Sequence, residues 1–360
     1  MNKHQYVAIM AGGIGSRFWP MSRTEFPKQF LDILNTGRTL IQSTYDRFAG
    51  FIPKENIFIV TAKEYVHIVK EQLPELDPAN ILAEPFRKNT APCVAYIAYK
   101  LLARDPEATL ICAPADHLVF DTTAFNKVCI EAQSFVNNHN ALVTLGIKPT
   151  YPNTGYGYIQ HEAHGVTDNV YPVKTFTEKP NLELARTFLQ SGDFLWNAGI
   201  FVWMVKTLVQ AFEKHLPEMH EVFYPERFNL NNENEIQAIE KIYPQCTNIS
   251  IDYGIMEKAD NVYVIPSSFG WSDLGTWASA YDNLEKDYLG NATTGQHILV
   301  IDSTKCMVHA PDEKLIVLQG LDDFIVVDTD DVLLICKKEK EQDIKEYVAE
   351  VKRNKWDKFL

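Results

Sequence analysis

Short apolar runs alternate with longer amphipathic segments through the first two thirds of the chain. The runs YVAIM (residues 6–10), IFIVTA (57–62), TLICAPA (109–115) and ALVTLGI (141–147) have the length and composition of buried strands. Helical periodicity marks the segments between and around them: 39–51, 64–73, 90–104 and 125–139. Strands that alternate with helices at this spacing predict an α/β fold, with a mostly parallel sheet covered by helices on both faces.

The pattern changes after Pro149. Glycine and aromatic residues crowd YPNTGYGYIQ (151–160), which predicts a substrate-covering insertion of strands and turns. From about Asn291 the chain consists of short apolar runs broken by turns: HILVID, CMVHA, LIVLQG, FIVVDT and DVLLICKK. Such regular short strands predict a small β-rich module of stacked rungs, like a β-helix, closed by a charged amphipathic helix. We therefore expect two domains, residues 1–285 and 286–360.

Composition narrows the class of protein. The 360 residues are 46% hydrophobic and 22% charged, which is typical of a soluble globular protein. The net charge of -13 argues against a nucleic-acid or membrane partner, because either would need a basic surface. No apolar stretch approaches membrane-spanning length. The six cysteines are scattered, and four lie inside apolar runs, so we expect reduced core residues in a cytoplasmic protein.

The stretch AGGIGSRFWPMSRTEFPKQF (11–30) directly follows the first predicted strand. Glycines let backbone N–H groups approach an anion closely, and Arg17 and Lys28 add positive charge, so the stretch is consistent with a phosphate cradle. It is neither a P-loop nor a dinucleotide fingerprint, since Phe18 stands where the latter needs its third glycine. Taken alone, Gly12, Gly13 and Gly15 fit a tight strand-to-helix turn equally well.

The whole string is more specific. G-G-x-G-x-R, an aromatic residue, Pro20 and then Pro-Lys-Gln strongly resemble the signature of the sugar-nucleotide pyrophosphorylases, in particular the mannose-1-phosphate guanylyltransferase branch. Further strings of that branch follow in the same order: EPFRKNTAP (84–92), APADH (113–117), TGYGYI (154–159), FTEKP (176–180), WNAGIFVW (196–203) and GWSDLGTW (270–277). The resemblance covers residues 1 to about 280. It implies a Rossmann-like nucleotidyltransferase domain of the GT-A type with a mostly parallel mixed sheet, plus the small β-rich C-terminal module.

The resemblance also implies which residues bind nucleotide. The backbone of the glycine loop (Gly12, Gly13, Gly15) would touch the nucleotide, and Arg17 and Lys28 would hold the triphosphate. Glu84, Asn89 and Thr90 would lie near the base. From the residues alone, Asn89 or Thr90 is equally an N-cap of the following helix, with Pro92 in its first turn.

A second set would bind the sugar phosphate. Glu178 would accept hydrogen bonds from sugar hydroxyls and Lys179 would bind the phosphate, although an exposed charge pair is the simpler interpretation of these two neighbours. The resemblance completes the sugar pocket with Gly157, Asn197 and Asp252.

The expected cofactor is Mg²⁺. Asp116 follows an apolar strand, at the edge where open α/β sheets bind ligands. The resemblance makes Asp116 and Asp273 the two metal ligands, and Mg²⁺ typically takes one or two carboxylates together with phosphate oxygens. As simple alternatives, Asp116 could cap a turn and Asp273 a helix.

The activity that the resemblance implies is transfer of a nucleotidyl group from GTP to α-D-mannose 1-phosphate, with release of pyrophosphate. Three alternatives stay open: another sugar phosphate or base, a glycosyltransferase of related fold, and a catalytically silent regulatory subunit. Because the cations and both metal carboxylates are present, an enzyme is favoured over the silent subunit. We expect GTP and mannose 1-phosphate as substrates, and a homodimer.

Overall fold

A computed structural model describes residues 2–360 and divides the chain into two compact units. The first unit contains the chain up to Gly12, Thr44–Ala115 and Val119–Trp271. The second contains Gly13–Ser43, Asp116–Leu118 and Ser272–Leu360.

The first unit is built on a nine-stranded sheet with the strand order β3-β2-β1-β4-β9-β6-β10-β8-β7. Parallel pairing joins β1 to β2 and β4, β2 to β3, and β6 to β10, whereas every pairing of β8 and β9 is antiparallel. All strands except β8 and β9 therefore run in one direction, so the predicted mostly parallel mixed sheet is confirmed. The strands are β1 (Gln5–Met10), β2 (Ile57–Ala62), β3 (Ile81–Glu84), β4 (Thr109–Pro114), β6 (Leu142–Ile147), β7 (Gly157–His161), β8 (Tyr171–Glu178), β9 (Phe194–Met204) and β10 (Val262–Ser267).

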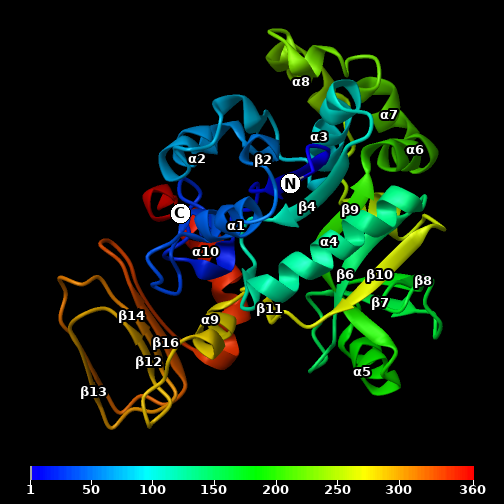
Figure 1. Cartoon of the computed structure of the whole chain (residues 1–360). Helices are drawn as coiled ribbons and strands as arrows, with labels where there is room; N and C mark the ends of the chain where they lie inside the picture. Colours follow the sequence, from blue (N-terminus) through cyan, green and yellow to red (C-terminus); the bar gives the residue numbers. More distant parts are fainter. Residues whose placement is uncertain (1) are drawn as a thin grey trace. The chain divides into compact units, whose positions relative to one another are not determined.

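Helices cover both faces of this sheet. On one face α3 packs against α6 and α7 over the side chains of β1, β2 and β4, and Figure 1 shows these helices grouped with α8 in the upper right of the view. On the other face α4 packs against β4, β9 and β10. Strand β2 is buried at every position, as a strand enclosed on both faces should be. The helices are α1 (Leu40–Ala49), α2 (Val66–Gln72), α3 (Thr90–Arg104), α4 (Thr122–Asn138), α5 (Leu182–Ser191), α6 (Val205–His215), α7 (Pro217–Phe223) and α8 (Glu235–Ile242).

The second unit contains the predicted β-rich module. Parallel strands stack in two small sheets, β12-β14-β16 and β13-β15, and antiparallel β17 closes the first. Each strand pairs with the strand of the next coil, so that Met307 lies opposite Ile325 and Ile298 opposite Ile316. This is the arrangement of β-helix rungs. The elements are α9 (Trp277–Asn283), β12 (Ala292–Thr294), β13 (Ile298–Ile301), β14 (Met307–His309), β15 (Ile316–Gln319), β16 (Phe324–Asp328), β17 (Leu333–Lys337) and α10 (Ile344–Arg353).

Two short strands, β5 (Leu118–Val119) and β11 (Trp271–Ser272), lie where the chain passes from one unit to the other. The six cysteines are buried thiols, as expected. Within residues 2–360, every helix is too short or too polar to cross a membrane.

Candidate active site

From Gly13 onward the glycine-rich stretch folds in the second unit around two short 3-10 turns, Ser16–Phe18 and Lys28–Phe30. Gly15 precedes the first turn with φ of +68°, a left-handed conformation that L side chains rarely adopt. A Cβ added there would overlap the Cβ of Lys28, so the close approach requires glycine. The backbone N–H of Lys28 also donates to the Ile14 carbonyl at 3.3 Å. Gly15 therefore brings Lys28 against the loop on which Arg17 lies.

Lys28 is a buried ammonium with two fixed partners. Only 4% of its side chain is exposed, and its Nζ donates to Asp116 Oδ2 at 2.8 Å and to the backbone carbonyl of Asp273 at 2.9 Å. The ring of Phe18 lies 5.5 Å from the same Nζ. Burial raises the pKa of Asp116, but the charges of Lys28 and His117 outweigh it, so this pKa lies below its usual value. Three segments far apart in the sequence thus meet at one cation.

Asp273 does not cap a helix, although a cap was one interpretation of its sequence. Thr276 is the N-cap of α9, in a capping box with Ser279. The Asp273 carboxylate instead accepts from the Gly275 N–H at 3.1 Å, and a Cβ on Gly275 would lie 2.5 Å from its Oδ2. The carboxylate therefore occupies space that only a glycine leaves open.

The oxygen donors of this group fit a hard divalent cation. Asp116 keeps about a third of its side chain exposed (34%) and is held ionised by Lys28. Lys28 binds both Asp116 and the main chain of Asp273, so the two predicted metal ligands lie near the same ammonium. No cluster of three or more His, Cys, Asp or Glu side chains suited to a metal occurs within residues 2–360. An ion here would take few protein ligands, and Mg²⁺ bound together with phosphates does the same.

Arg17 also belongs to the second unit. Its Nε is buried and has no hydrogen-bond partner within the described chain. A buried donor of this kind is costly unless something accepts from it. The nearby charge of Arg17 contributes to lowering the pKa of Lys345 on α10. An anionic acceptor at Nε would remove this cost.

The predicted base-binding residues lie in the first unit. Glu84 ends β3 and is buried, and a Cβ placed on Gly12 would lie 3.4 Å from Glu84 Oε2. The Tyr243 hydroxyl donates to Glu84 Oε1 at 3.0 Å. Burial raises the pKa of Glu84 to about 7, against the opposing effects of Tyr243 and Arg87. Gly12 and Glu84 therefore lie close together in the first unit.

Asn89 and Thr90 are engaged in structural contacts. Asn89 is the N-cap of α3, and its side chain accepts from the Thr90 N–H at 2.9 Å. Thr90 Oγ1 accepts from the Ile251 N–H at 2.9 Å. The capping interpretation is confirmed, and Thr90 ties α3 to the segment that carries Asp252.

The predicted sugar-binding residues form a compact cluster in the first unit. Gly157 lies so close to Glu178 that a Cβ would overlap Oε2. The Asn197 amide donates to Asp252 Oδ1 at 2.9 Å, and its own oxygen accepts from the Thr144 hydroxyl at 2.9 Å. Asp252 begins a π-helical turn, Asp252–Met256, a feature common at functional sites. Strands β7, β8 and β9 and this turn converge on one group of polar side chains.

Lys179 is the cation of this cluster. It follows β8 with φ of +48°, its side chain is 59% exposed, and its Nζ donates to Glu178 Oε1 at 2.5 Å. Burial lowers the pKa of Lys179, but the interactions with Glu178 and Asp252 raise it by a larger amount. The pKa of Lys179 therefore lies above its usual value. Burial and the charge of Glu178 together raise the pKa of Asp252 to about 6.

Two residues that sequence reasoning missed support these groups. The Glu257 carboxylate accepts from the backbone N–H of Glu178 at 3.2 Å, which adds a third carboxylate to the cluster around Lys179. Tyr243 holds Glu84 from a position 159 residues away. Glu257 stands in the string SIDYGIMEKAD, where its spacing from Asp252 was a usable signal. Tyr243 carried no local signal.

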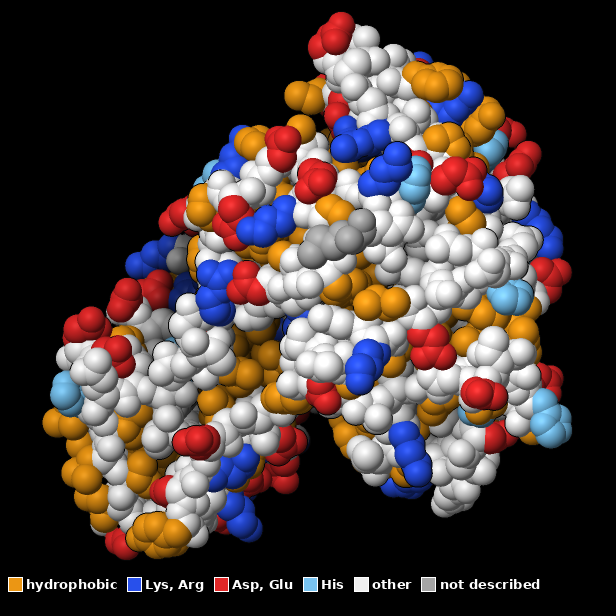
Figure 2. All heavy atoms as spheres, viewed as in Figure 1, with side chains coloured by type: hydrophobic (Ala, Val, Ile, Leu, Met, Phe, Trp, Pro, Cys, Tyr) orange, Lys and Arg blue, Asp and Glu red, His pale blue; other side chains and the backbone are white. Residues whose placement is uncertain are grey.

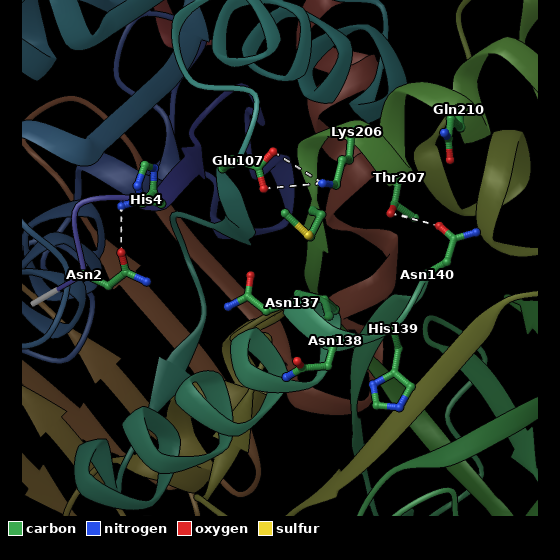
Figure 3. Close-up of a pocket in the computed structure, with 12 residues that line it drawn as sticks. Asn2, His4, Glu107, Asn137, Asn138, His139, Asn140, Lys206, Thr207 and Gln210 are labelled. Atoms are coloured by element: carbon green, nitrogen blue, oxygen red, sulfur yellow. Dashed lines mark hydrogen bonds and ion pairs between the residues drawn. The ribbon is translucent and has the colours of Figure 1, made fainter.

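A hollow of about 820 Å³ lies elsewhere in the first unit, where β1, β4 and β6 begin. Figure 3 shows its lining, in which Lys206 pairs with Glu107 and Thr207 bonds to Asn140. None of the predicted site residues lines it. Its polar groups largely satisfy one another, and open α/β sheets bind ligands at the opposite, carboxyl ends of their strands. We assign it no role in the chemistry.

Comparison with known proteins decides the family. A model of the family described as "Nucleotidyl transferase" matches residues 6–288, which is most of the chain. The chain belongs to the nucleotidyl transferase family. A second model, "MannoseP isomerase/GMP-like beta-helix domain", matches residues 295–351. The predicted enzyme class, the family resemblance and the β-helix module are thereby confirmed.

Several relatives of this nucleotidyltransferase align over nearly its whole length. "Alginate biosynthesis protein AlgA" of Pseudomonas aeruginosa is 38% identical over 95% of this chain and 71% of the relative. "Mannose-1-phosphate guanylyltransferase" of Salmonella montevideo is 36% identical over 96% of this chain and 73% of the relative. A crystal structure from Thermus thermophilus, described as "mannose-1-phosphate geranyltransferase", superposes with a TM-score of 0.86 at 30% identity, covering 97% of this chain and 99% of that one. Nucleotidyltransferases of this family use a divalent metal ion.

Proposed function

We propose that this nucleotidyltransferase is a mannose-1-phosphate guanylyltransferase, which converts GTP and α-D-mannose 1-phosphate into GDP-mannose and pyrophosphate. The observation that supports this most is the alignment of relatives carrying that name with 96% of the chain, β-helix module included. These relatives are 36% and 34% identical to the chain over the aligned residues.

The phosphate group of mannose 1-phosphate is already an anionic nucleophile, so the reaction needs no general base and no covalent intermediate. Catalysis then consists of positioning and charge neutralisation. We assign the triphosphate to Arg17 and Lys28. Arg17 offers a buried donor without a partner, and Lys28 offers an ammonium whose position is fixed. Both would stabilise the charge on the departing pyrophosphate.

The sugar phosphate is assigned to the cluster of the first unit. Glu178 and Asp252 are acceptors for sugar hydroxyls, and Asn197 orients Asp252 through its 2.9 Å hydrogen bond. Lys179 is exposed enough to exchange Glu178 for the phosphate of the substrate. Gly157 keeps the space beside Glu178 open.

Mg²⁺ is the metal we assign, with Asp116 and Asp273 as the residues that would hold it. When bound, Mg²⁺ supplies positive charge to phosphate oxygens. Lys28 keeps Asp116 ionised and therefore ready for a cation, because it holds the pKa of that carboxyl below its usual value.

We further propose that the protein is cytoplasmic, that the domain boundary lies between residues 285 and 286, and that the protein is a homodimer.

The β-helix strands bury alternate side chains and leave apolar ones outward, at Leu299, Val317 and Ile335. Figure 2 shows hydrophobic side chains exposed over this module. Exposed apolar patches on a soluble protein mark interaction surfaces, and a second copy is the occupant we propose. Light scattering of Leu299→Glu/Val317→Glu should report a monomer, whereas an unchanged dimer would exclude this surface.

A pyrophosphate-release assay tests the activity. Purified protein with Mg²⁺ should be assayed with each of GTP, ATP, UTP and dTTP against mannose 1-phosphate and glucose 1-phosphate. We expect the highest kcat/KM for GTP with mannose 1-phosphate. A higher value for dTTP with glucose 1-phosphate would make the branch assignment wrong, and no activity with any pair would favour a silent subunit.

A further inference from the structure

The two oxygens of the Glu84 carboxylate have different surroundings. Oε1 accepts the Tyr243 hydroxyl at 3.0 Å. Oε2 lies beside Gly12, at 3.4 Å from the position a Cβ would take there. One oxygen is therefore committed to Tyr243, and the other lies beside a glycine that we assign to the nucleotide.

Tyr243 is held by packing as well as by this bond. It is completely buried, and its ring lies edge-on to those of Tyr96 and Phe223, each with centroids 6.3 Å away. Its hydroxyl also reaches the Pro92 carbonyl at 3.3 Å, and a single proton can serve only one of the two acceptors at a time. The shorter bond goes to Glu84. Burial raises the pKa of Tyr243 far above its usual value, so the hydroxyl stays a donor.

We propose that Tyr243 is a positioning residue for base selection, which fixes Glu84 so that Oε2 accepts from a purine with an N–H donor at N1. Guanine has this donor, next to the further donor of its 2-amino group. Adenine has an acceptor at N1, which an ionised carboxylate repels. This inference rests on the proposed function, because it assumes that a nucleotide base lies beside Gly12.

The charge state of Glu84 decides which base it prefers, because only the ionised carboxylate is purely an acceptor. Burial raises the pKa of Glu84 to about 7, whereas the Tyr243 hydrogen bond and the charge of Arg87 oppose that rise. Two further groups face it and are neutral: Cys93, whose pKa is raised by burial and the charge of Glu84, and Tyr96, whose pKa is raised by burial and by Glu235. Without the Tyr243 hydroxyl the pKa of Glu84 rises further, and less of the acceptor form remains at neutral pH.

Tyr243→Phe in the full-length protein tests this inference. The kcat/KM for GTP, ITP and ATP should be measured with mannose 1-phosphate from pH 6 to pH 9. We expect the GTP-to-ATP ratio at pH 7 to fall about tenfold, as for loss of a hydrogen bond to a charged group, and to recover toward the wild-type ratio at pH 9. ITP lacks the exocyclic amine, so its loss should be smaller than that of GTP. The KM for mannose 1-phosphate should stay unchanged.

Tyr96→Phe is the matched control. Tyr96 is a buried tyrosine of the same ring cluster, but its hydroxyl donates to Glu235 at 2.8 Å and not to Glu84. It should keep the wild-type base ratio at every pH. An equal change in both variants would reduce the role of Tyr243 to packing and overturn the inference.

Glu84→Gln keeps the test decisive if Tyr243→Phe fails to fold. Its base ratio should be low and independent of pH, because the amide does not titrate in this range. A wild-type ratio in Glu84→Gln, or in folded Tyr243→Phe, overturns the inference while the enzyme still makes GDP-mannose. Failure of the proposed function would look different, since the wild-type protein would then not use GTP with mannose 1-phosphate at all.

Discussion

The two groups of predicted site residues differ in how their charges are arranged. In the second unit a single buried cation, Lys28, is surrounded by oxygen atoms from Asp116 and Asp273. In the first unit two carboxylates, Glu178 and Asp252, face one exposed cation, Lys179, and a third, Glu257, accepts from the Glu178 backbone. The group around Lys28 holds a positive charge at a fixed position, whereas the group around Lys179 gathers several hydrogen-bond acceptors.

This contrast matches two different ligand chemistries. A triphosphate with its metal needs fixed charges, because its own charge is large and shifts during the reaction. A sugar needs hydrogen-bond acceptors at its hydroxyls, and only its single phosphate needs a cation. The burial of the two lysines agrees with this division, since 4% of the Lys28 side chain and 59% of the Lys179 side chain is exposed.

The largest loss of activity is expected for Lys28→Met. This change removes the fixed charge and leaves Asp116 without its ammonium partner, so kcat/KM for GTP should fall by roughly 2–4 kcal/mol in free-energy terms. Initial-rate kinetics with varied GTP measure it. Lys206→Met is the control, because Lys206 pairs with Glu107 on the surface and should leave the rate unchanged. A Lys28→Met enzyme with wild-type kinetics would remove Lys28 from the triphosphate site.

Asp116→Asn and Asp273→Asn should each lower kcat by orders of magnitude while the fold survives, because each removes a carboxylate that we assign to the metal and keeps the shape of the side chain. If the two carboxylates hold one ion, the double variant should be little worse than either single variant. Titration of activity with Mg²⁺ should show a higher half-saturating concentration in both, and Mn²⁺ should partly restore the rate. Full multiplicative loss in the double variant would contradict a shared ion.

Alanine substitutions at three glycines of the second unit distinguish the cost of a positive φ from the cost of steric overlap by the added Cβ. Gly15→Ala would suffer both a positive φ and an overlap with Lys28, so unfolding free energy should drop by about 1–3 kcal/mol or more. Gly37→Ala has a φ of +80° but open space, so only about 1 kcal/mol should be lost. Gly13→Ala meets neither obstacle and should keep wild-type stability. Denaturant unfolding of the three variants should give this order, and equal losses would refute the assigned overlap.

The smallest expected effect is the pH dependence of protein stability that comes from the carboxylate Asp252. The pKa of Asp252 is raised from 3.8 to about 6 in the folded state, chiefly by burial and by Glu178. The folded state therefore binds this proton more tightly than the unfolded chain, and stability is lost as pH rises from 3.8 to about 6. Asp252→Asn should have a higher Tm than the wild type at pH 8 and about the same Tm at pH 4. A variant that is less stable at pH 8 would contradict the assigned pKa.

Much of the fold could be predicted because its signals are local. Apolar runs such as TLICAPA mark buried strands, and the rung-like spacing after Asn291 marks the β-helix, without any knowledge of partners. The cap of α3 at Asn89 was likewise one of two interpretations that neighbouring residues allowed.

The site was less predictable because its contacts are long-range. Nothing in FPKQF reveals that Lys28 donates to the main chain of a residue 245 positions later. Tyr243 stands in KIYPQ, a segment with no functional pattern, yet its hydroxyl holds Glu84. Asp273 could equally have capped a helix, and only the capping box of Thr276 rules that out. Such roles depend on which segments the sheet brings together.

The most direct test is whether Lys28 and Lys179 serve separate substrates. Initial rates of Lys28→Met and Lys179→Ala should be measured with one substrate varied while the other, GTP or mannose 1-phosphate, is saturating. We expect Lys28→Met to impair the use of GTP and to leave the KM for mannose 1-phosphate near the wild-type value. Lys179→Ala should do the reverse, with a rise of about tenfold or more in the KM for mannose 1-phosphate, the size expected for a lost charge-assisted contact. If both variants raised the KM of the same substrate, or Lys179→Ala left sugar-phosphate kinetics unchanged, the two groups would not serve separate substrates.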